Sequence, residues 1–396
     1  MAPPDSVVIV GAARTPIGAF LGALKDVTAP DLGAAAISAA LGASALPGVV
    51  IDEVVMGCVL QAGLGQAPAR QAALGAGLPE STGCVTLNKM CGSGMKALMS
   101  AHDALRAGSA RAVIAGGMES MSNAPYLLDR ARSGLRMGHR TLLDHMFFDG
   151  LEDAYEKGRL MGAFAEDCAR MHGIDRIAQD DYAVASLERT LQTIADGGFR
   201  AEIAPVKARI GKSTEIVDAD ETPLRARIED IPRLKPAFAA DGTITAANAS
   251  SISDGAAALV VTTQATAAEF GAAPHAQIVG HATHAAAPRD FPTAPIGAIE
   301  KLLHKVGWTQ ASVDLFEINE AFAVVALIAM RELGLPHDRV NVCGGACALG
   351  HPIGASGARI VVTLLAALER RGLRRGVAAL CIGGGEATAV AIERCG

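Results

Sequence analysis

The sequence has few charged residues and no concentration of charge of one sign. Charged residues make up 19% of its 396 residues, whereas hydrophobic residues make up 50%. This balance excludes a disordered chain, because disorder requires low hydrophobicity and high net charge. The formal net charge is −6 and no basic stripe is present, so we expect no nucleic-acid partner.

Cysteines and long apolar segments are also scarce. Eight cysteines are too few and too scattered for a disulfide scaffold, which favours a reducing compartment. The longest uncharged apolar run, about Ala321–Met330, falls short of the roughly 18 residues that a membrane-spanning helix needs. The first residues lack the basic and apolar regions of a secretory signal. We therefore expect a cytoplasmic enzyme with no membrane partner.

Short β-branched runs alternate with Ala- and Leu-rich stretches, a pattern typical of an α/β protein whose sheet is covered by helices. Near the N-terminus the pattern predicts a strand over Val7–Val10 that stops at Gly11, and a helix over Asp31–Leu41 capped by Asp31. Further predicted strands and helices are Val54–Val59, Ala67–Ala76, Met95–Ala107, Ala112–Ala115, Ala257–Thr262, Ala276–Val279 and Val377–Leu380.

One unit of this pattern occurs twice. Cys91-Gly-Ser-Gly, a helix, a strand and then Gly-Gly-Met-Glu119 match Gly354-Ala-Ser-Gly, a helix, a strand and then Gly-Gly-Gly-Glu386. A chance likeness between two Ala- and Gly-rich helices is the alternative. The shared order of features favours duplicated α/β domains whose sites face each other across a pseudo-two-fold axis.

The alternation lapses between the two copies. Charged residues, Met and Arg become more frequent between residues 120 and 245, which indicates a long insertion packed on the first copy. We therefore expect an N-terminal repeat over residues 1–119 and 246–270, an inserted loop domain over 120–245, and a C-terminal repeat over 271–396.

Cys91 lies directly before the predicted helix of the first copy. A thiol at a helix N-terminus feels the positive end of the helix dipole, which is expected to lower its pKa from about 8.5. Gly92 and Gly94 permit a sharp turn and a close approach of substrate, which is the geometry of a nucleophile elbow. A buried structural cysteine is the alternative. The context favours a nucleophile.

The second copy has a histidine and a cysteine at related places. His351, between Gly350 and Pro352, lies on an irregular loop, where an imidazole suits a general base. Cys381 follows a predicted strand and precedes three glycines, whose backbone N–H groups are available for an oxyanion hole. A hydrogen-bonded loop histidine and a packed core cysteine are the alternatives.

Three further patterns have competing interpretations. Asn319, between a strand and an apolar helix, is either an N-cap or a polar group that holds a water or a carbonyl in the site.

Cys343, Cys347 and His351 are spaced four residues apart, but the surrounding glycines and proline disfavour a helix, and no fourth ligand has zinc spacing. No glycine cluster forms the dinucleotide or Walker A motif. We expect no metal and no cofactor.

Together these residues resemble the thiolase family, the acetyl-CoA C-acetyltransferases. The resemblance extends from Arg14-Thr-Pro-Ile-Gly18 to Cys381-Ile-Gly-Gly-Gly-Glu386. Its specific motifs are Asn88-Lys-Met-Cys-Gly-Ser-Gly94, Gly116-Gly-Met-Glu-Ser-Met-Ser122, Asn248-Ala-Ser250, Asn319-Glu-Ala-Phe322 and Gly350-His-Pro-Ile-Gly354. The resemblance implies the thiolase fold, duplicated α/β domains in five αβαβα layers with a long inserted loop domain that faces CoA.

The resemblance also implies a role for each site residue. Cys91 would carry the acyl group, His351 would activate it, and Cys381 would be the second acid/base. Asn319 would hold a catalytic water that forms one oxyanion hole with His351, and the backbone amides of Cys91 and Gly383 would form another. Substrate and CoA contacts are implied for Ser250, Met161, Phe322 and Arg225.

The implied reaction is the reversible Claisen condensation of two acetyl-CoA, or the thiolysis of 3-ketoacyl-CoA, by ping-pong chemistry through acyl-Cys91. Acetyl-CoA, acyl-CoA and CoA are the implied partners, fatty acid metabolism the implied setting, and a homotetramer built from two dimers the implied assembly. Leu160 stands where many biosynthetic members have a histidine, and Cys343 where many members have an asparagine. Leu160 therefore leaves the acyl chain-length range open. The physiological direction is open for another reason: the condensation of acetyl-CoA is uphill, so its direction depends on removal of the product.

Two rival functions compete with this one. A condensing enzyme of the ketoacyl-synthase type shares the duplicated fold, but usually pairs its cysteine with two histidines or a histidine and an asparagine, so Cys381 argues against it. A non-catalytic acyl-CoA or lipid carrier of the same fold would leave Cys91, His351 and Cys381 without a purpose.

Overall fold

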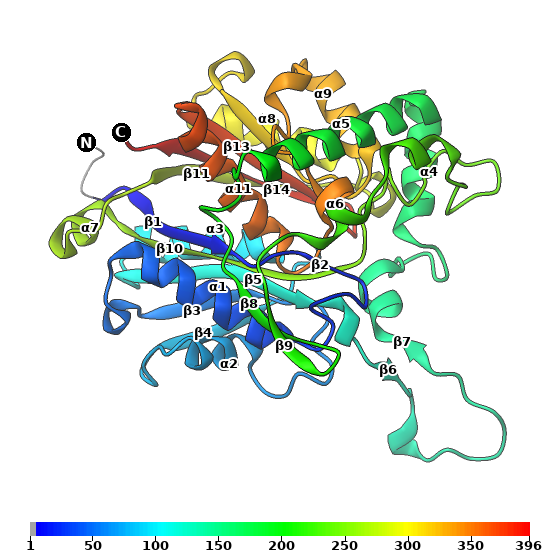
Figure 1. Cartoon of the computed structure of the whole chain (residues 1–396), viewed down its shortest axis with the longest axis horizontal. Coiled ribbons are helices and arrows are strands. Elements are labelled where there is room, and N and C mark those ends of the chain that lie inside the picture. The colour runs from blue at the N-terminus through cyan, green and yellow to red at the C-terminus, as the bar shows by residue number, and fades with distance from the viewer. Residues whose placement is uncertain (1–4) are drawn as a thin grey trace.

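The computed structural model describes residues 5–396, so residues 1–4 of the expected N-terminal repeat lie outside the described residues. The largest element is a ten-stranded mixed sheet with the order β12-β13-β14-β11-β1-β10-β5-β3-β4, in which β2 pairs with β10 (Figure 1). The first half of the chain and the strand after residue 245 supply β1 (Val7–Arg14), β2 (Gly18–Ala19), β3 (Glu53–Gly57), β4 (Gly83–Leu87), β5 (Ala112–Ser120) and β10 (Ser253–Thr263). The last part supplies β11 (Ala276–Ala285), β12 (Leu315–Ile318), β13 (Arg375–Ile382) and β14 (Glu386–Arg394).

The helices form three layers around this sheet. The first half contains α1 (Ala29–Ser44), α2 (Pro68–Gly75), α3 (Ser93–Arg106) and α7 (Gln264–Phe270), and the last part contains α8 (Ala294–Val306), α9 (Ala323–Leu333), α10 (Ala346–Leu349) and α11 (Ser356–Arg371). In Figure 1, α1 and α2 lie on one outer side, α8 and α9 lie on the other, and α3 and α11 lie between the two halves of the sheet. The predicted duplicated α/β architecture is therefore confirmed.

Alternate side chains of each central strand pack against different helix layers. Val7 and Ile9 of β1 belong to the core around α3 and α11, whereas Val8 and Val10 belong to the core beneath α1 and α2. β13 divides its side chains in the same way between the central core and the core beneath α8 and α9. Because both faces are buried, these strands are nearly continuous apolar runs in the sequence.

The two halves of the sheet meet through a short contact. β1 pairs with β11 at Val8–Gln277 and Ile9–Ala276. Beyond this contact the half-sheets separate, and the two central helices lie between them (Figure 1). The geometry places the N-termini of α3 and α11 side by side in the middle of the molecule.

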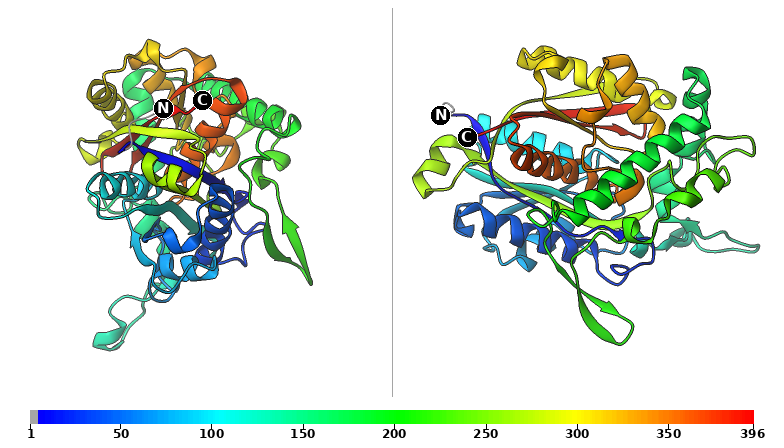
Figure 2. Two further views of the ribbon diagram at one scale, coloured as in Figure 1. Left: turned by 90° about the vertical axis from the view of Figure 1, so that its left-hand side faces the viewer. Right: turned by 45° about the horizontal axis from the view of Figure 1, so that its top comes forward.

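Residues 121–245 form smaller structures beside the large sheet. They contain the paired strands β6 (Tyr126–Leu127) and β7 (Leu143–Asp144), a π-helical turn (Met146–Leu151), α4 (Met161–His172), α5 (Arg176–Ala195), the paired strands β8 (Val206–Ile210) and β9 (Ser213–Val217), and α6 (Glu221–Arg225). The β8–β9 hairpin and the loop between β6 and β7 project from the body of the molecule (Figure 2). α5 contacts α9 and α10, so this segment also packs on the C-terminal half.

Three local predictions are wrong. β1 does not stop at Gly11 but continues to Arg14, with a register irregularity between Ile9 and Gly11. A side chain at Gly11 would lie 2.2 Å from the carbonyl oxygen of Ala40, so the glycine permits α1 to approach the strand rather than ending it. The cap of α1 is Thr28, whose side chain accepts a hydrogen bond from the Asp31 N–H.

The glycine pair Gly116–Gly117 likewise does not end β5, which runs on to Ser120. A Cβ atom at Gly117 would lie 2.0 Å from the carbonyl oxygen of Gly354, which is in the loop before α11. Glycine is needed here because a loop from the other half of the molecule rests directly on the strand backbone.

The central helices also contact each other through glycines. A Cβ atom at Gly94 would lie 2.7 Å from the Ala358 backbone nitrogen, and one at Gly357 would lie 2.4 Å from the Met95 backbone nitrogen. Backbone therefore meets backbone where α3 and α11 cross, within the first three residues of each helix. Any side chain at this crossing would push the two helix N-termini apart.

We predict that Gly357→Ala lowers the free energy of unfolding by about 1–3 kcal/mol, the usual cost of overpacking a rigid core. Gly42→Ala is the matched control, because it also lies in a helix and its new methyl group would meet no atom within 4 Å. The control should gain up to about 1 kcal/mol from higher helix propensity. Denaturant unfolding at one protein concentration measures both, and equal stabilities would contradict the close crossing.

Candidate active site

A cavity of about 320 Å³ lies at the N-termini of the two central helices. Cys91 from the first half and His351, Cys381 and Gly383 from the second half line it. Ser250, Phe322 and Met161 line it as well, so the structure brings together seven of the nine site residues expected from the sequence. Much of the remaining wall is apolar and comes from Phe147, Leu151, Leu160, Phe238, Phe291 and Ile353.

Cys91 lies in a tight turn between β4 and α3. Met90 has a φ of 48°, a left-handed conformation that is costly for a residue with a side chain. The Ser93 hydroxyl fixes this turn, since it accepts a hydrogen bond from the Lys89 N–H at 2.9 Å and donates one to the Met90 carbonyl at 2.6 Å. The turn agrees with the predicted nucleophile elbow.

The cavity raises the pKa of the Cys91 thiol instead of lowering it. Burial raises the pKa to about 11, even though the backbone N–H groups of Gly383 and of Cys91 itself act in the opposite direction. The expectation that the helix terminus lowers this pKa is therefore wrong, because loss of hydration destabilises the thiolate more than the nearby N–H groups stabilise it. A thiol in this place needs a base to become a nucleophile.

His351 has the properties of that base. Burial lowers the pKa of its imidazole to about 3, with a further contribution from the positive charge of Arg359, so the ring is neutral at pH 7. Its Nδ1 lies 2.6 Å from the Ser356 hydroxyl, which also lies 3.0 Å from the Pro352 carbonyl. If Ser356 donates to that carbonyl, it accepts from Nδ1–H, and Nε2 keeps a lone pair. Nε2 has no hydrogen-bond partner within the described part of the chain.

Cys381 is the penultimate residue of β13 and is almost completely buried. Burial raises its pKa well above the usual thiol value, and the negative charge of a neighbouring Cys91 thiolate raises it further. The three glycines after the strand form a turn in which Gly384 and Gly385 have φ values of 93° and 87°. This turn presents the Gly383 N–H to the Cys91 sulfur.

Asn319 is buried behind the cavity lining rather than in it. The interpretation of Asn319 as an N-cap is wrong, because α9 begins at Ala323 with Phe322 as its cap. The Asn319 side-chain oxygen lies 3.5 Å from a guanidinium nitrogen of Arg359, the same residue whose charge reaches His351. Its amide nitrogen has no partner among the described residues, which leaves a donor for a water or a carbonyl.

Arg225 is not brought to the cavity. It ends α6, its side chain is 67% exposed, and it forms an ion pair with Glu221 one helical turn earlier. Glu221 in turn accepts hydrogen bonds from the backbone of Ala19 and Ala23. The arginine is therefore part of a surface ion pair outside the cavity lining, and its expected CoA contact stays a prediction.

The sequence indicated Glu119 only as part of the repeated motif, yet its carboxylate connects two loops of the site. It accepts hydrogen bonds from the backbone N–H groups of Val59, Leu60 and Gly354 at 2.9–3.1 Å, and so joins the loop after β3 to the loop that carries His351. Burial raises its pKa to about 7. The sequence contains a signal for this function, because a glutamate at a strand end after two glycines is unusual in an apolar core and is expected to have hydrogen-bond partners.

The structure also shows where the side chains of the alternative metal site, Cys343, Cys347 and His351, lie. α10 supplies one helical turn where none was expected, and it contains Cys347. Cys343 accepts a hydrogen bond from Arg370 at 3.1 Å, whereas Cys347 lies 3.8 Å from the Glu320 carbonyl oxygen. The two thiols therefore have different neighbours and do not converge with the imidazole.

We predict that alkylation of Cys91 by iodoacetamide accelerates about tenfold per pH unit between pH 7 and 9, because a thiol with a raised pKa gains thiolate over that whole range. His351, with its lowered pKa, stays neutral throughout and adds no step. Subtracting the Cys91→Ser protein removes the reaction of the other thiols. A rate that is flat from pH 6 to 8 would instead indicate a preformed thiolate–imidazolium pair.

Comparisons with known proteins agree with this geometry. Residues 7–265 match the family Thiolase, N-terminal domain, and residues 272–394 match Thiolase, C-terminal domain. The chain is 47% identical to an acetyl-CoA acetyltransferase of Pseudomonas aeruginosa, over 98% of this chain and 100% of the relative. It is 49% identical to acetyl-CoA acetyltransferase 2 of Arabidopsis thaliana, over 98% and 97%.

Solved structures give the same result. The Acat5 thiolase of Ascaris suum in complex with coenzyme A superimposes with a TM-score of 0.93 at 42% identity, covering 98% of this chain and 100% of that one. The acetyl-CoA acetyltransferase of Bacillus anthracis superimposes with a TM-score of 0.96 at 40% identity, covering 98% and 99%. With both family domains in order along one chain and the fold shared over nearly its whole length, this protein belongs to the thiolase family and is an acyltransferase.

Proposed function

We propose that the protein is an acetyl-CoA acetyltransferase, which interconverts two acetyl-CoA with acetoacetyl-CoA and CoA through an acyl group on Cys91. The observation that carries the proposal is the apolar cavity at which Cys91, His351 and Cys381 meet beside the Gly383 N–H. The names of the relatives in Pseudomonas aeruginosa and Arabidopsis thaliana support the same substrate.

The first half-reaction transfers an acetyl group to Cys91. His351 takes the Cys91 proton at Nε2, and the thiolate attacks the acetyl-CoA carbonyl, so a C–S bond to Cys91 forms as the bond to CoA breaks. Cys381 donates its proton to the departing CoA thiolate. The enzyme then holds acetyl-Cys91, an imidazolium and a Cys381 thiolate.

The second half-reaction forms the carbon–carbon bond. The Cys381 thiolate takes an α-proton from a second acetyl-CoA, and the resulting carbanion attacks the carbonyl of acetyl-Cys91. The bond between that carbonyl and Cys91 breaks, and His351 returns its proton to the sulfur. Acetoacetyl-CoA leaves, and all three groups regain their starting protonation.

Each half-reaction places negative charge on a thioester oxygen, so two sets of donors are required. The N–H groups of Cys91 and Gly383 converge on one sulfur and are suited to the oxygen of the Cys91-bound acyl group. For the oxygen of the second acetyl-CoA we propose His351 together with the free Asn319 amide, acting through a water. No step requires a metal or a redox cofactor.

Thiolysis of longer 3-ketoacyl-CoA is the second candidate function. Leu160 takes the place of a polar histidine, and with Met161 and Phe238 it makes the acyl side of the cavity apolar. Steady-state rates with acetoacetyl-CoA and with a longer 3-ketoacyl-CoA distinguish the two functions.

We predict that incubation with acetyl-CoA places an acetyl group on Cys91, identified by acid quench and peptide mass spectrometry. Cys91→Ser should lose at least about a hundredfold in activity, because a hydroxyl is ionised far less than a thiol. Cys84→Ser is the control, since that partly exposed thiol lies outside the cavity. An acetyl group on another cysteine would refute the assignment, and a protein that binds acetyl-CoA without being acetylated would instead be a carrier.

We predict that Cys381→Ser still acetylates Cys91 but exchanges the methyl protons of acetyl-CoA with deuterium at least about a hundredfold more slowly, because a hydroxyl cannot replace the thiolate base. His351→Ala should slow both acetylation and exchange, because His351 activates Cys91 and also stabilises the oxygen of the second acetyl-CoA, so only Cys381→Ser separates the two steps. Nuclear magnetic resonance of the acetyl methyl group follows the exchange. Wild-type exchange in Cys381→Ser would remove this cysteine from the proton transfer.

We also infer that the chain forms a dimer or tetramer in the cytoplasm. The eight cysteines are all unpaired, and no helix within residues 5–396 is long and apolar enough to cross a membrane. The edge strand β4 leaves Val85 44% exposed, and the projecting loop leaves Met137 99% exposed, so both have apolar surface to cover. Sedimentation velocity should show a dimer or larger, and a 40.4 kDa monomer would contradict the inference.

A further inference from the structure

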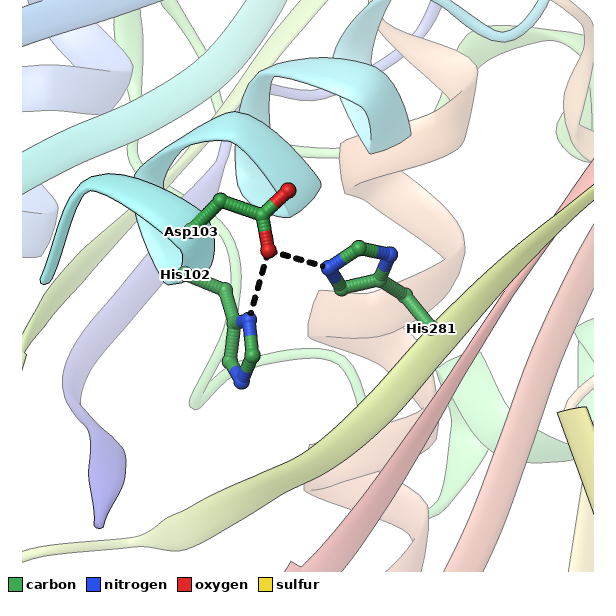
Figure 3. Close-up of side chains that lie close together, drawn as sticks. All are labelled: His102, Asp103 and His281. Atoms are coloured by element: carbon green, nitrogen blue, oxygen red, sulfur yellow. Dashed lines mark hydrogen bonds and ion pairs between the residues drawn. The ribbon is translucent and has the colours of Figure 1, made fainter. Parts of the chain in front are cut away.

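Two histidines and an aspartate meet far from the active site. His102 and Asp103 belong to the last turns of α3, and His281 belongs to β11, 178 positions further along the chain (Figure 3). One oxygen of Asp103 lies 3.2 Å from His102 Nδ1 and 2.8 Å from His281 Nε2. Each side chain thus offers one ligand atom, and the three atoms lie within 4.8 Å of one another.

The separations suit a transition-metal ion. Zinc binds imidazole nitrogen and carboxylate oxygen at about 2.0–2.2 Å, which puts neighbouring ligand atoms of a tetrahedral site about 3.4 Å apart. The Asp103 oxygen lies closer to the two imidazole nitrogens than that spacing by about 0.2 Å and about 0.6 Å, so the side chains must move apart by these amounts to admit the ion. Two imidazoles and one carboxylate favour zinc, nickel or copper over magnesium, which prefers oxygen ligands.

The surroundings hold the two imidazoles in place. The His102 and His281 side chains are 15% and 11% exposed, and their rings pack edge to face with centroids 5.0 Å apart. Asp103 is 57% exposed, so an ion and a coordinating water can enter from its side. The nearby Lys305 ammonium is directed to the His281 carbonyl oxygen at 3.1 Å.

We propose that His102, Asp103 and His281 form a binding site for one divalent transition-metal ion, with water in the remaining position. The ion would join α3, which carries the Cys91 loop at its other end, to β11 of the C-terminal half. His102 is nine residues from the start of α3, or about 14 Å along the helix, so the site is separate from the cavity. Its role is to fasten the two halves of the molecule together.

The sequence does not reveal this site. Two of the ligands are adjacent in the chain and the third is on a distant strand, a spacing that matches no zinc motif. Among the described residues, this is the one group of three or more His, Cys, Asp or Glu side chains with converging ligand atoms. Hydrogen bonding of two imidazoles to one carboxylate, with no metal, is the competing explanation.

The test is a calorimetric titration of the full-length protein with Ni²⁺ after dialysis against a chelator. Nickel is the probe because imidazole binds it well, whereas zinc also favours the thiolates. We expect one site whose affinity falls at least tenfold in His281→Gln and in Asp103→Asn. His275→Gln is the matched control, since His275 also pairs with a carboxylate, Glu369, but belongs to no group of three.

All eight cysteines remain in every variant, so binding to thiols contributes equally throughout. Thermal unfolding provides a second measurement: Ni²⁺ should raise the melting temperature of the native protein and of His275→Gln, but not that of Asp103→Asn, because an ion that binds the folded state stabilises it. Asp103 is exposed, so its variant keeps the test valid even if His281→Gln fails to fold. Equal Ni²⁺ affinity in the native protein and Asp103→Asn would overturn the proposal, as would equal binding of Mg²⁺.

Discussion

The structure depends on the backbone contact between the two central helices. Because Gly94 and Gly357 have no side chains, α3 and α11 cross so closely that a methyl group on either would overlap the other helix. The same contact sets the distance between the loops in front of the helices, one with Cys91 and the other with His351. The close crossing of the two helices therefore sets both the packing of the core and the geometry of the site.

An apolar cavity around a nucleophile has two opposite effects. It keeps the Cys91 thiol protonated, since burial raises its pKa to about 11, and it keeps His351 neutral, since burial lowers its pKa to about 3. A neutral imidazole beside a neutral thiol is ready to accept its proton when a substrate carbonyl takes up the charge. The low dielectric that opposes ionisation also strengthens the N–H groups that stabilise an oxyanion.

Buried carboxylates organise the irregular loops around the site. Glu119 satisfies three backbone N–H groups from two loops, and Glu320 accepts from the Tyr182 hydroxyl, the Asn341 amide and the Cys347 N–H. A loop inside a protein has no strand or helix partner for its N–H groups, so a side chain must supply the acceptors. These acids explain how glycine-rich loops remain ordered in the middle of the molecule.

The sequence by itself determined the α/β class and the duplication, and its motifs predicted seven of the residues that line the cavity, because strand periodicity, helix starts and the loop motifs are local features. The Gly-Ser-Gly and His-Pro-Ile-Gly segments predict turns from their own residues, whatever segments later pack against them. The tertiary structure alone decided the pKa of Cys91, the surface ion pair of Arg225 with Glu221, the function of Glu119 and the contact of His281 with α3. Each of these depends on which distant segments remove water or supply a partner, and residue spacing along the chain carries no record of that.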